Sequence, residues 1–200
     1  MTKGHRHNIR KAKEFGIFAY EDKNFNHYED FILIYNETMK RNNALEYYFF
    51  SKNYFNDLRN LLGDRIKLFV AKKNDDIISA SLFLITGEVI QYHLSGTSNK
   101  WLNYSSSKVI IDEVRKWGTS QGYKWFHLGG GLGSTRDSIF HFKSGFSKLN
   151  FSFEVMKSIL EPQIYDKLIA QKKHWLEACG CEIASDNYFP IYCAPFKKKT

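Results

Sequence analysis

A run of glycines and a lone lysine stand out in the stretch LGGGLGSTRDSIFHFKSGF, which covers residues 128 to 146. Gly129, Gly130 and Gly131 end an apolar run, and Lys143 follows Phe142 within an aromatic segment. Glycines allow a ligand or another backbone to approach closely, and a lysine held beside aromatic rings can face a developing oxyanion. The stretch therefore has residue types that can bind and polarise a small substrate, although a structural turn and a surface lysine are the alternatives.

These residues do not form a common nucleotide-binding motif. A dinucleotide fingerprint needs G-x-G-x-x-G, and the third glycine is missing whether counting starts at Gly129 or Gly131. A Walker loop needs a glycine before its lysine, whereas Phe142 precedes Lys143. The sequence also lacks the Ser-His-Asp order, the H-E-x-x-H zinc helix and a paired-carboxylate motif, so we expect neither hydrolase chemistry nor a metal site.

Tyr92 and His93 are the candidate polar residues of an apolar segment, VIQYHLS, that is typical of a strand. A histidine has a pKa near 6.5, so His93 can take a proton from an amine as a general base. A hydrogen-bonded core histidine is the alternative. Strand alternation does not decide which of the two residues faces inward, and we keep Tyr92 as a candidate substrate contact.

The sequence is basic, with a formal net charge of +8. Such a balance indicates an anionic partner, such as nucleic acid, a phosphorylated substrate or a membrane surface. Arg6 and Arg10, in the N-terminal run GHRHNIRKAK, are the candidate contacts to an anionic substrate, for example a nucleotide-linked precursor or tRNA. A solvated helix face is the other interpretation.

The periodicity of apolar residues predicts alternating helices and strands. Helices are expected over 8–15, 24–41, 55–62, 106–121, 137–146 and 163–178, and strands over 17–22, 66–70, 78–85, 89–95, 124–128 and 151–160. The three middle strands form an antiparallel meander, and the strand at 124–128 is expected to be parallel to its neighbour.

Size and composition favour one globular domain. The 43% of hydrophobic residues can bury a substantial core within 200 residues. We expect a single domain over 1–200, with a leading helix and strand at 1–23, a core at 24–160, and a C-terminal helix and tail at 161–200. The apolar runs are shorter than a membrane span and the basic N-terminus lacks the apolar core of a secretory signal, so the sequence predicts no transmembrane segment and a cytoplasmic protein.

Several segments of the sequence together resemble a known family. GHRHNIRKAKEFGI, FILIYNETMKR, VIQYHLSGTS and WFHLGGGLGSTRDSIFHFKSGFS are similar to the Fem-type branch of the GNAT superfamily, over about residues 3 to 160. That branch includes the peptidoglycan bridge-forming aminoacyltransferases and related acetyltransferases. The resemblance implies an α/β (α+β) fold with a central mixed, mostly antiparallel sheet flanked by helices. It also implies that Phe142 and Lys143 match a pair associated with stabilising the transition state.

Two departures from the family pattern affect the expected partners. A bridge-forming enzyme resembles two GNAT units in tandem, whereas this chain looks like the second one, so a second GNAT-like chain or a homodimer is a possible partner. Acetyl-CoA enzymes of the superfamily carry a Q/R-x-x-G-x-G/A loop, whereas the corresponding SGTSNKWLNYSSSK contains only Gly96. We therefore keep aminoacyl-tRNA and acetyl-CoA as alternative acyl donors and expect no firmly bound cofactor.

The resulting hypothesis is an acyltransferase that moves an aminoacyl or acyl group to the amine of a small molecule or a peptidoglycan precursor in cell-wall synthesis. One alternative is an acyl-CoA-dependent N-acetyltransferase. Another, from a different class, is a non-catalytic basic binding module or half of a split enzyme.

Overall fold

The computed structural model describes residues 1–131, 135–185 and 187–199. The chain forms two compact units, Met1–Asn150 and Phe151–Thr200. Within the described residues, no helix combines the length and apolar character needed to cross a membrane.

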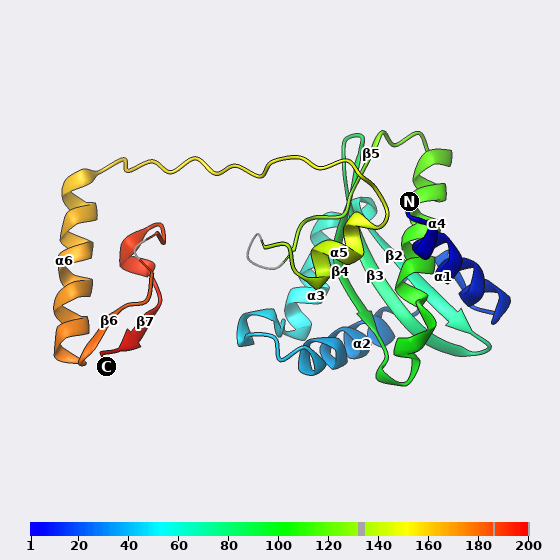
Figure 1. Ribbon diagram of the computed structural model, residues 1–200, viewed down its shortest axis with the longest axis horizontal. Helices are drawn as coiled ribbons and strands as arrows, with labels where there is room; N and C mark the ends of the chain where they lie inside the picture. Colours follow the sequence, from blue (N-terminus) through cyan, green and yellow to red (C-terminus); the bar gives the residue numbers. More distant parts are fainter. Residues whose placement is uncertain (132–134, 186, 200) are drawn as a thin grey trace. The chain divides into compact units, whose positions relative to one another are not determined.

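The first unit is built on a five-stranded sheet with the order β1-β2-β3-β4-β5 (Figure 1). Its strands are β1 (Phe18–Glu21), β2 (Ile66–Lys73), β3 (Asp76–Thr86), β4 (Val89–Thr97) and β5 (Trp125–His127). The first four strands pair antiparallel with their neighbours, and β5 pairs parallel with β4. The structure thus confirms the predicted meander, the parallel strand and the mixed, mostly antiparallel sheet.

Helices cover both faces of this sheet (Figure 1). The α-helices are α1 (Lys3–Glu14), α2 (Tyr28–Arg41), α3 (Lys52–Leu62), α4 (Ser106–Ser120) and α5 (Ser138–Ser144), and the short 3-10 helices are η1 (Glu46–Tyr48), η2 (Gly63–Arg65) and η3 (Asn99–Tyr104). Core residues of α1 and α4 pack on one face, and those of α2 and α3 pack on the other.

Strand β2 shows how the sequence produces two cores. Phe69 and Ala71 belong to the cluster under α1 and α4, whereas Leu68 and Val70 belong to the cluster under α2 and α3. Successive side chains of a strand point to opposite faces, so a continuous apolar run is needed where both faces are covered. The aromatic residues of α2 and α3 fill the second cluster, in which Phe31 and Phe55 are fully buried.

Two helix starts differ from the prediction because of local backbone geometry and hydrogen bonds. Helix α2 begins at Tyr28 rather than 24, since Phe25 has a positive φ of 57° and the Asp22 carboxylate accepts a hydrogen bond from the His27 amide at 2.7 Å. Helix α1 begins at Lys3 rather than 8, because Thr2 caps it by accepting a hydrogen bond from the His5 amide.

The second unit is small. Helix α6 (Pro162–Ala178) precedes a two-stranded antiparallel sheet of β6 (Cys181–Ile183) and β7 (Phe196–Lys198), with the 3-10 helix η5 (Ile191–Cys193) between the strands. Its buried apolar residues in the described part of the chain are Leu176, Cys181 and Ala194.

The predicted strand over 151–160 is wrong. The segment has no strand structure, and its side chains are exposed. Phe151, Phe153 and Val155 do alternate with polar residues, as a half-buried strand requires. Alternation identifies the face that a strand would bury, but a strand also needs a neighbour to complete its hydrogen bonds, and the pattern does not supply that neighbour.

Candidate active site

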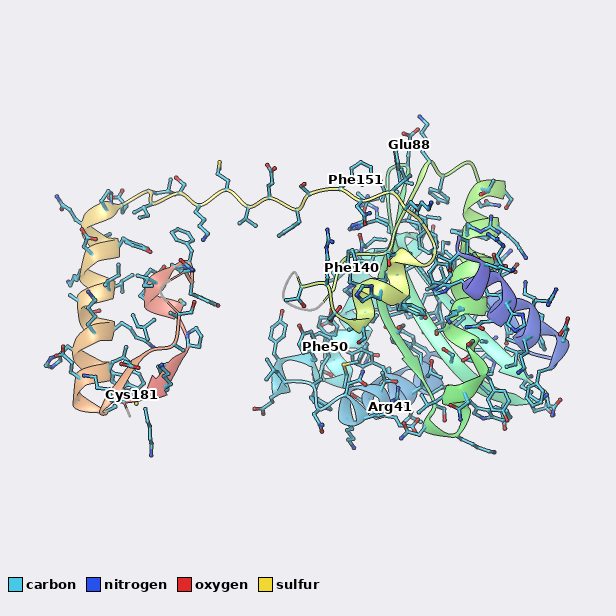
Figure 2. All side chains as sticks on the ribbon, in the orientation of Figure 1. Arg41, Phe50, Glu88, Phe140, Phe151 and Cys181 are labelled. Atoms are coloured by element: carbon cyan, nitrogen blue, oxygen red, sulfur yellow. The ribbon has the colours of Figure 1, made fainter. Side chains whose placement is uncertain are left out.

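The sheet opens between its two parallel strands. The pairing of β4 with β5 joins Val89–Gln91 to Trp125–His127, whereas β4 continues to Thr97. At the start of β5 the register is set by the carbonyl of Glu88 (labelled in Figure 2), which accepts hydrogen bonds from the amides of Lys124 and Trp125 at 3.0 and 3.2 Å. Strand β4 therefore extends beyond the last residue that pairs with β5, and the two strands separate after Gln91 and His127.

A β-bulge in β4 lies at this opening. Phe83 of β3 is opposite Tyr92 and Leu82 is opposite Leu94, so His93 is the extra residue. The bulge shifts the alternation of the strand: Tyr92 packs with the core under α4, and its hydroxyl donates a hydrogen bond to Ser95 Oγ at 2.6 Å. The inward residue on the α4 side is therefore Tyr92. Burial raises its pKa, so the phenol stays protonated at neutral pH.

His93 has the properties of a neutral base. Its Nε2 atom is buried and, among the described residues, has no hydrogen-bond partner. Burial lowers the pKa of His93 below 6.5, because the charged imidazolium is poorly solvated there. The ring is therefore uncharged at neutral pH, and the same burial opposes its protonation.

Lys143 is held at the end of β5 by the short helix α5. The carboxylate of Asp137 caps this helix by accepting a hydrogen bond from the Phe140 amide at 2.8 Å. Lys143 Nζ donates to the Gly130 carbonyl at 2.9 Å and lies 5.8 Å from the centroid of the Tyr92 ring. Burial lowers the pKa of Lys143, and the charge of Asp137 opposes that shift. A partly desolvated ammonium group thus faces Tyr92 beside the opening.

The three consecutive glycines serve different purposes. Gly129 has a positive φ of 74°, and a Cβ there would lie 3.3 Å from Lys143 Nζ. A Cβ on Gly131 would lie 2.2 Å from the Thr135 carbonyl oxygen, so this position requires glycine for close packing. Gly130 has open space where a Cβ would be, and its carbonyl holds Lys143. The glycine run thus forms a turn that positions the lysine.

His5 is a site residue that the sequence interpretation missed. Its Nε2 donates a hydrogen bond to the Phe142 carbonyl at 2.9 Å, and its ring meets the edge of Phe146 at a centroid distance of 4.6 Å. The Thr2 amide also donates to the Gly145 carbonyl at 2.8 Å. The start of α1 therefore clamps α5 from a position 137 residues away in the chain, a separation that no local spacing reveals.

The predicted site residues fall into two groups. Tyr92, Gly129, Gly130 and Lys143 lie together, with His93 next to them in β4 and Phe142 fixed by His5. Arg6 and Arg10 line a different cavity, between α1 and α4. In the described part of the chain, no group of three or more His, Cys, Asp or Glu side chains could hold a metal ion.

Comparison with known proteins agrees with this architecture. The sequence model of the family described as "Acetyltransferase (GNAT) domain" matches residues 1–144. An aminoglycoside acetyltransferase from an uncultured soil metagenomic sample, solved with sisomicin, is 13% identical with a TM-score of 0.57, over 74% of this chain and 99% of that chain. No match was found among curated proteins.

Two other solved structures share the fold. FemX is 13% identical with a TM-score of 0.61, over 72% of this chain, which spans 52% of the FemX chain. A possible acetyltransferase from Clostridium difficile 630 is 6% identical with a TM-score of 0.53, over 72% of this chain and 98% of that one. At these identities the likeness is one of fold, and the family match over residues 1–144 carries the assignment. This chain belongs to the GNAT acetyltransferase domain family.

Proposed function

We propose that this chain transfers an acyl group from an activated donor to an amine, with Lys143 stabilising the negative charge that develops on the acyl oxygen. The observation that carries this proposal is the position of Lys143 Nζ, 2.9 Å from the Gly130 carbonyl and above the Tyr92 ring, where β4 and β5 separate. A cation in a partly desolvated site interacts more strongly with an oxyanion than it would in water.

The chemistry requires three events that the described residues can support. The acceptor nitrogen forms a bond to the acyl carbon, the donor's leaving group departs, and the nitrogen loses a proton. His93 Nε2, buried and unpartnered among the described residues, is the proposed acceptor of that proton. Lys143 is proposed to stabilise the tetrahedral intermediate, a role for which a single donor typically supplies about 3–4 kcal/mol.

The start of α4 fits the diphosphate of acetyl-CoA. This helix has no side-chain cap, and the Oγ atom of buried Ser106 has no hydrogen-bond partner among the described residues. Free amides at a helix N-terminus, together with the helix dipole, favour an anion. The amides of Ser106 and Ser107 and the side chain of Lys108 would hold the diphosphate, because the Lys108 amide already donates to the Ser105 carbonyl, and the thioester would supply the activated acyl group. Gly96 contributes to packing instead, since a Cβ there would lie 2.7 Å from the Ile34 carbonyl oxygen.

Aminoacyl-tRNA is the second candidate donor. The likeness to FemX covers 52% of that chain, so a second GNAT-like chain or a homodimer would complete the substrate groove under this proposal. The acceptor would then be a peptidoglycan precursor, whereas the aminoglycoside acetyltransferase fold favours a smaller amine.

Ligand-dependent thermal unfolding tests these alternatives. The unfolding midpoint is measured with acetyl-CoA, CoA, aminoacyl-tRNA and uncharged tRNA added separately, the uncharged tRNA being the control for nonspecific charge. A donor at about 100 times its Kd adds about 2.7 kcal/mol, which raises the midpoint by about 5–10 °C for a chain of this size. A rise with CoA compounds supports the acetyltransferase route, and a rise with charged tRNA alone supports the aminoacyl route. No rise with any donor contradicts the proposal and favours a non-catalytic binding module.

A further inference from the structure

The cavity between α1 and α4 has no role in the transfer chemistry proposed above. Its volume is about 540 Å³, which is large enough for a small organic ligand. The lining residues come from the N-terminus, from α1 and α4, and from the segment that follows α5. They are Met1, Arg6, Ile9, Arg10, Lys13, Glu14, Asp112, Arg115 and Phe146. Four of these side chains are cationic and two are carboxylates, so the cavity has a formal excess of positive charge.

The buried carboxylate of the cavity is already neutralised by neighbouring cations. Asp112, which is 6% exposed, accepts a hydrogen bond from Arg115 at 2.9 Å and lies 3.3 Å from both Lys13 and Lys116. Burial alone would raise the pKa of Asp112, but the bonds to Arg115, Lys116 and Lys13 bring it below its usual value. Three cations therefore surround Asp112, and although Lys116 also lies 3.8 Å from Glu113, positive charge remains for a ligand.

The two arginines of α1 are the cations of the cavity that remain available to bind an anion. Arg6 and Arg10 are four residues apart, which places them as neighbours on one face of the helix. Arg6 donates to the Met1 carbonyl, and Arg10 lies 3.6 Å from Glu14 in an exposed pair, which is a weak interaction. Arg10 also lies 3.5 Å from His7 Nδ1, and neither guanidinium group is bonded to a buried carboxylate, so both retain N–H groups that can bind an anion.

We infer that this cavity binds a phosphate-bearing small molecule, with Arg6 and Arg10 contacting the phosphate oxygens and with Ile9 and Phe146 covering an apolar part of the ligand. Guanidinium groups match the geometry of phosphate oxygens and bind them through pairs of charge-assisted hydrogen bonds. Ile9 is a buried side chain of α1, and Phe146 packs on the His5 ring, so packing within the first unit supports this apolar wall. The inference goes beyond the proposed function, because it concerns a second site and stands whether or not Lys143 acts in transfer.

Calorimetric titration of the full chain with inorganic pyrophosphate tests the inference, with saturating CoA present throughout to occupy the proposed diphosphate site at the start of α4. The key variant is Arg6→Gln/Arg10→Gln, and the matched control is Lys3→Gln/Lys11→Gln, which removes the same charge from the same helix at positions that do not line the cavity. We expect the wild type to bind pyrophosphate with an affinity that falls as salt is added. The arginine variant should bind at least about tenfold more weakly, since each lost charge-assisted bond costs about that factor, and the lysine control should stay within about twofold.

Three outcomes overturn the inference: no binding by the wild type, an equal loss in both double variants, or unchanged binding by the arginine variant. Equal loss would mean that net charge alone attracts the anion. Lys143→Ala separates this site from the proposed catalytic function, because we expect that variant to keep wild-type pyrophosphate affinity even if transfer is abolished. Thermal unfolding of each variant confirms that it is folded.

Discussion

Asp112 is buried in the first unit and Lys143 is half-buried, and their surroundings differ in kind. Asp112 is surrounded by Arg115, Lys13 and Lys116, at 2.9, 3.3 and 3.3 Å, so its negative charge is more than balanced. Lys143 Nζ donates to a backbone carbonyl, that of Gly130, and its pKa is lowered by burial. The pKa of Asp112 is lowered for the opposite reason, because cations overcome its burial.

The difference separates a charge that supports the fold from one that is available for chemistry. A compensated buried carboxylate ties α4 to α1 and favours the folded state. A partly desolvated ammonium group costs free energy when it donates to a neutral carbonyl and the charge of Asp137 offsets only part of the effect of burial on its pKa, and such groups are concentrated at functional sites. The account therefore predicts opposite responses when each charge is removed.

The largest expected effect is on catalysis, from Lys143→Ala. The loss of one oxyanion donor should lower kcat/KM about 100- to 1,000-fold, without lowering the unfolding midpoint. Steady-state kinetics and thermal unfolding measure both quantities, and Lys148→Ala, a change of the same type at an exposed lysine, should leave both unchanged. Wild-type activity in Lys143→Ala would contradict the role of the lysine.

The next effect is on stability, from Asp112→Asn. Removal of the carboxylate leaves three cations close together, but they are 38–53% exposed at their side chains, so we expect a loss of about 2 kcal/mol rather than the larger cost of a fully buried pair. Urea unfolding measures the change. Asp75→Asn, at a fully exposed side chain, should fall within about 0.5 kcal/mol of the wild type. A loss no greater than that of the control would show that the network does not stabilise the fold.

A smaller effect on rate should follow from Gly145→Ala. A Cβ there would lie 2.3–2.8 Å from atoms of the His5 ring, so α5 or α1 must shift and move Lys143. Small displacements of a reacting group cost up to about 100-fold, and we expect roughly tenfold in kcat. Gly4→Ala, on α1 beside His5 but with open space around it, should keep the wild-type rate. If both variants keep it, the clamp by His5 does not position Lys143.

The smallest effect is a change of stability with pH. The pKa of Asp112 is lower in the folded chain than the usual 3.8, so its contribution is present above about pH 4 and is lost as the pH falls through the folded pKa. Urea unfolding of wild type and Asp112→Asn should therefore converge in acid. A stability difference that stays constant from neutral pH to acid would contradict this linkage.

Much of the fold was predictable from the sequence because apolar periodicity dominates it. Ser106–Ser120 has apolar residues at helical spacing, and the continuous apolar run Leu68–Ala71 within Ile66–Lys73 is typical of a strand between two cores. The segment 151–160 shows the limit of periodicity as a signal, because its apolar and polar residues alternate although the segment forms no strand.

The site was predictable where the residues lie close in sequence and unpredictable where tertiary contacts define it. Lys143 and Gly130 belong to one quoted stretch, and the structure joins them at 2.9 Å. The choice between Tyr92 and His93 depended on a bulge that simple alternation does not reveal. His5 contacts Phe142 only because α1 and α5 meet in the folded chain, and a single sequence has no signal for that contact.

The central claim is that Lys143 is a desolvated cation at the acyl-transfer site, and NMR titration of its ammonium group tests it without a known acceptor. The protein is labelled at lysine 13Cε, and the signal is assigned by its absence in Lys143→Arg. The account predicts a pKa below the ordinary value of 10.5, because burial disfavours the charge, and a change in the Lys143 signal when acetyl-CoA or aminoacyl-tRNA is added. An ordinary pKa together with a signal that neither donor changes would contradict the account.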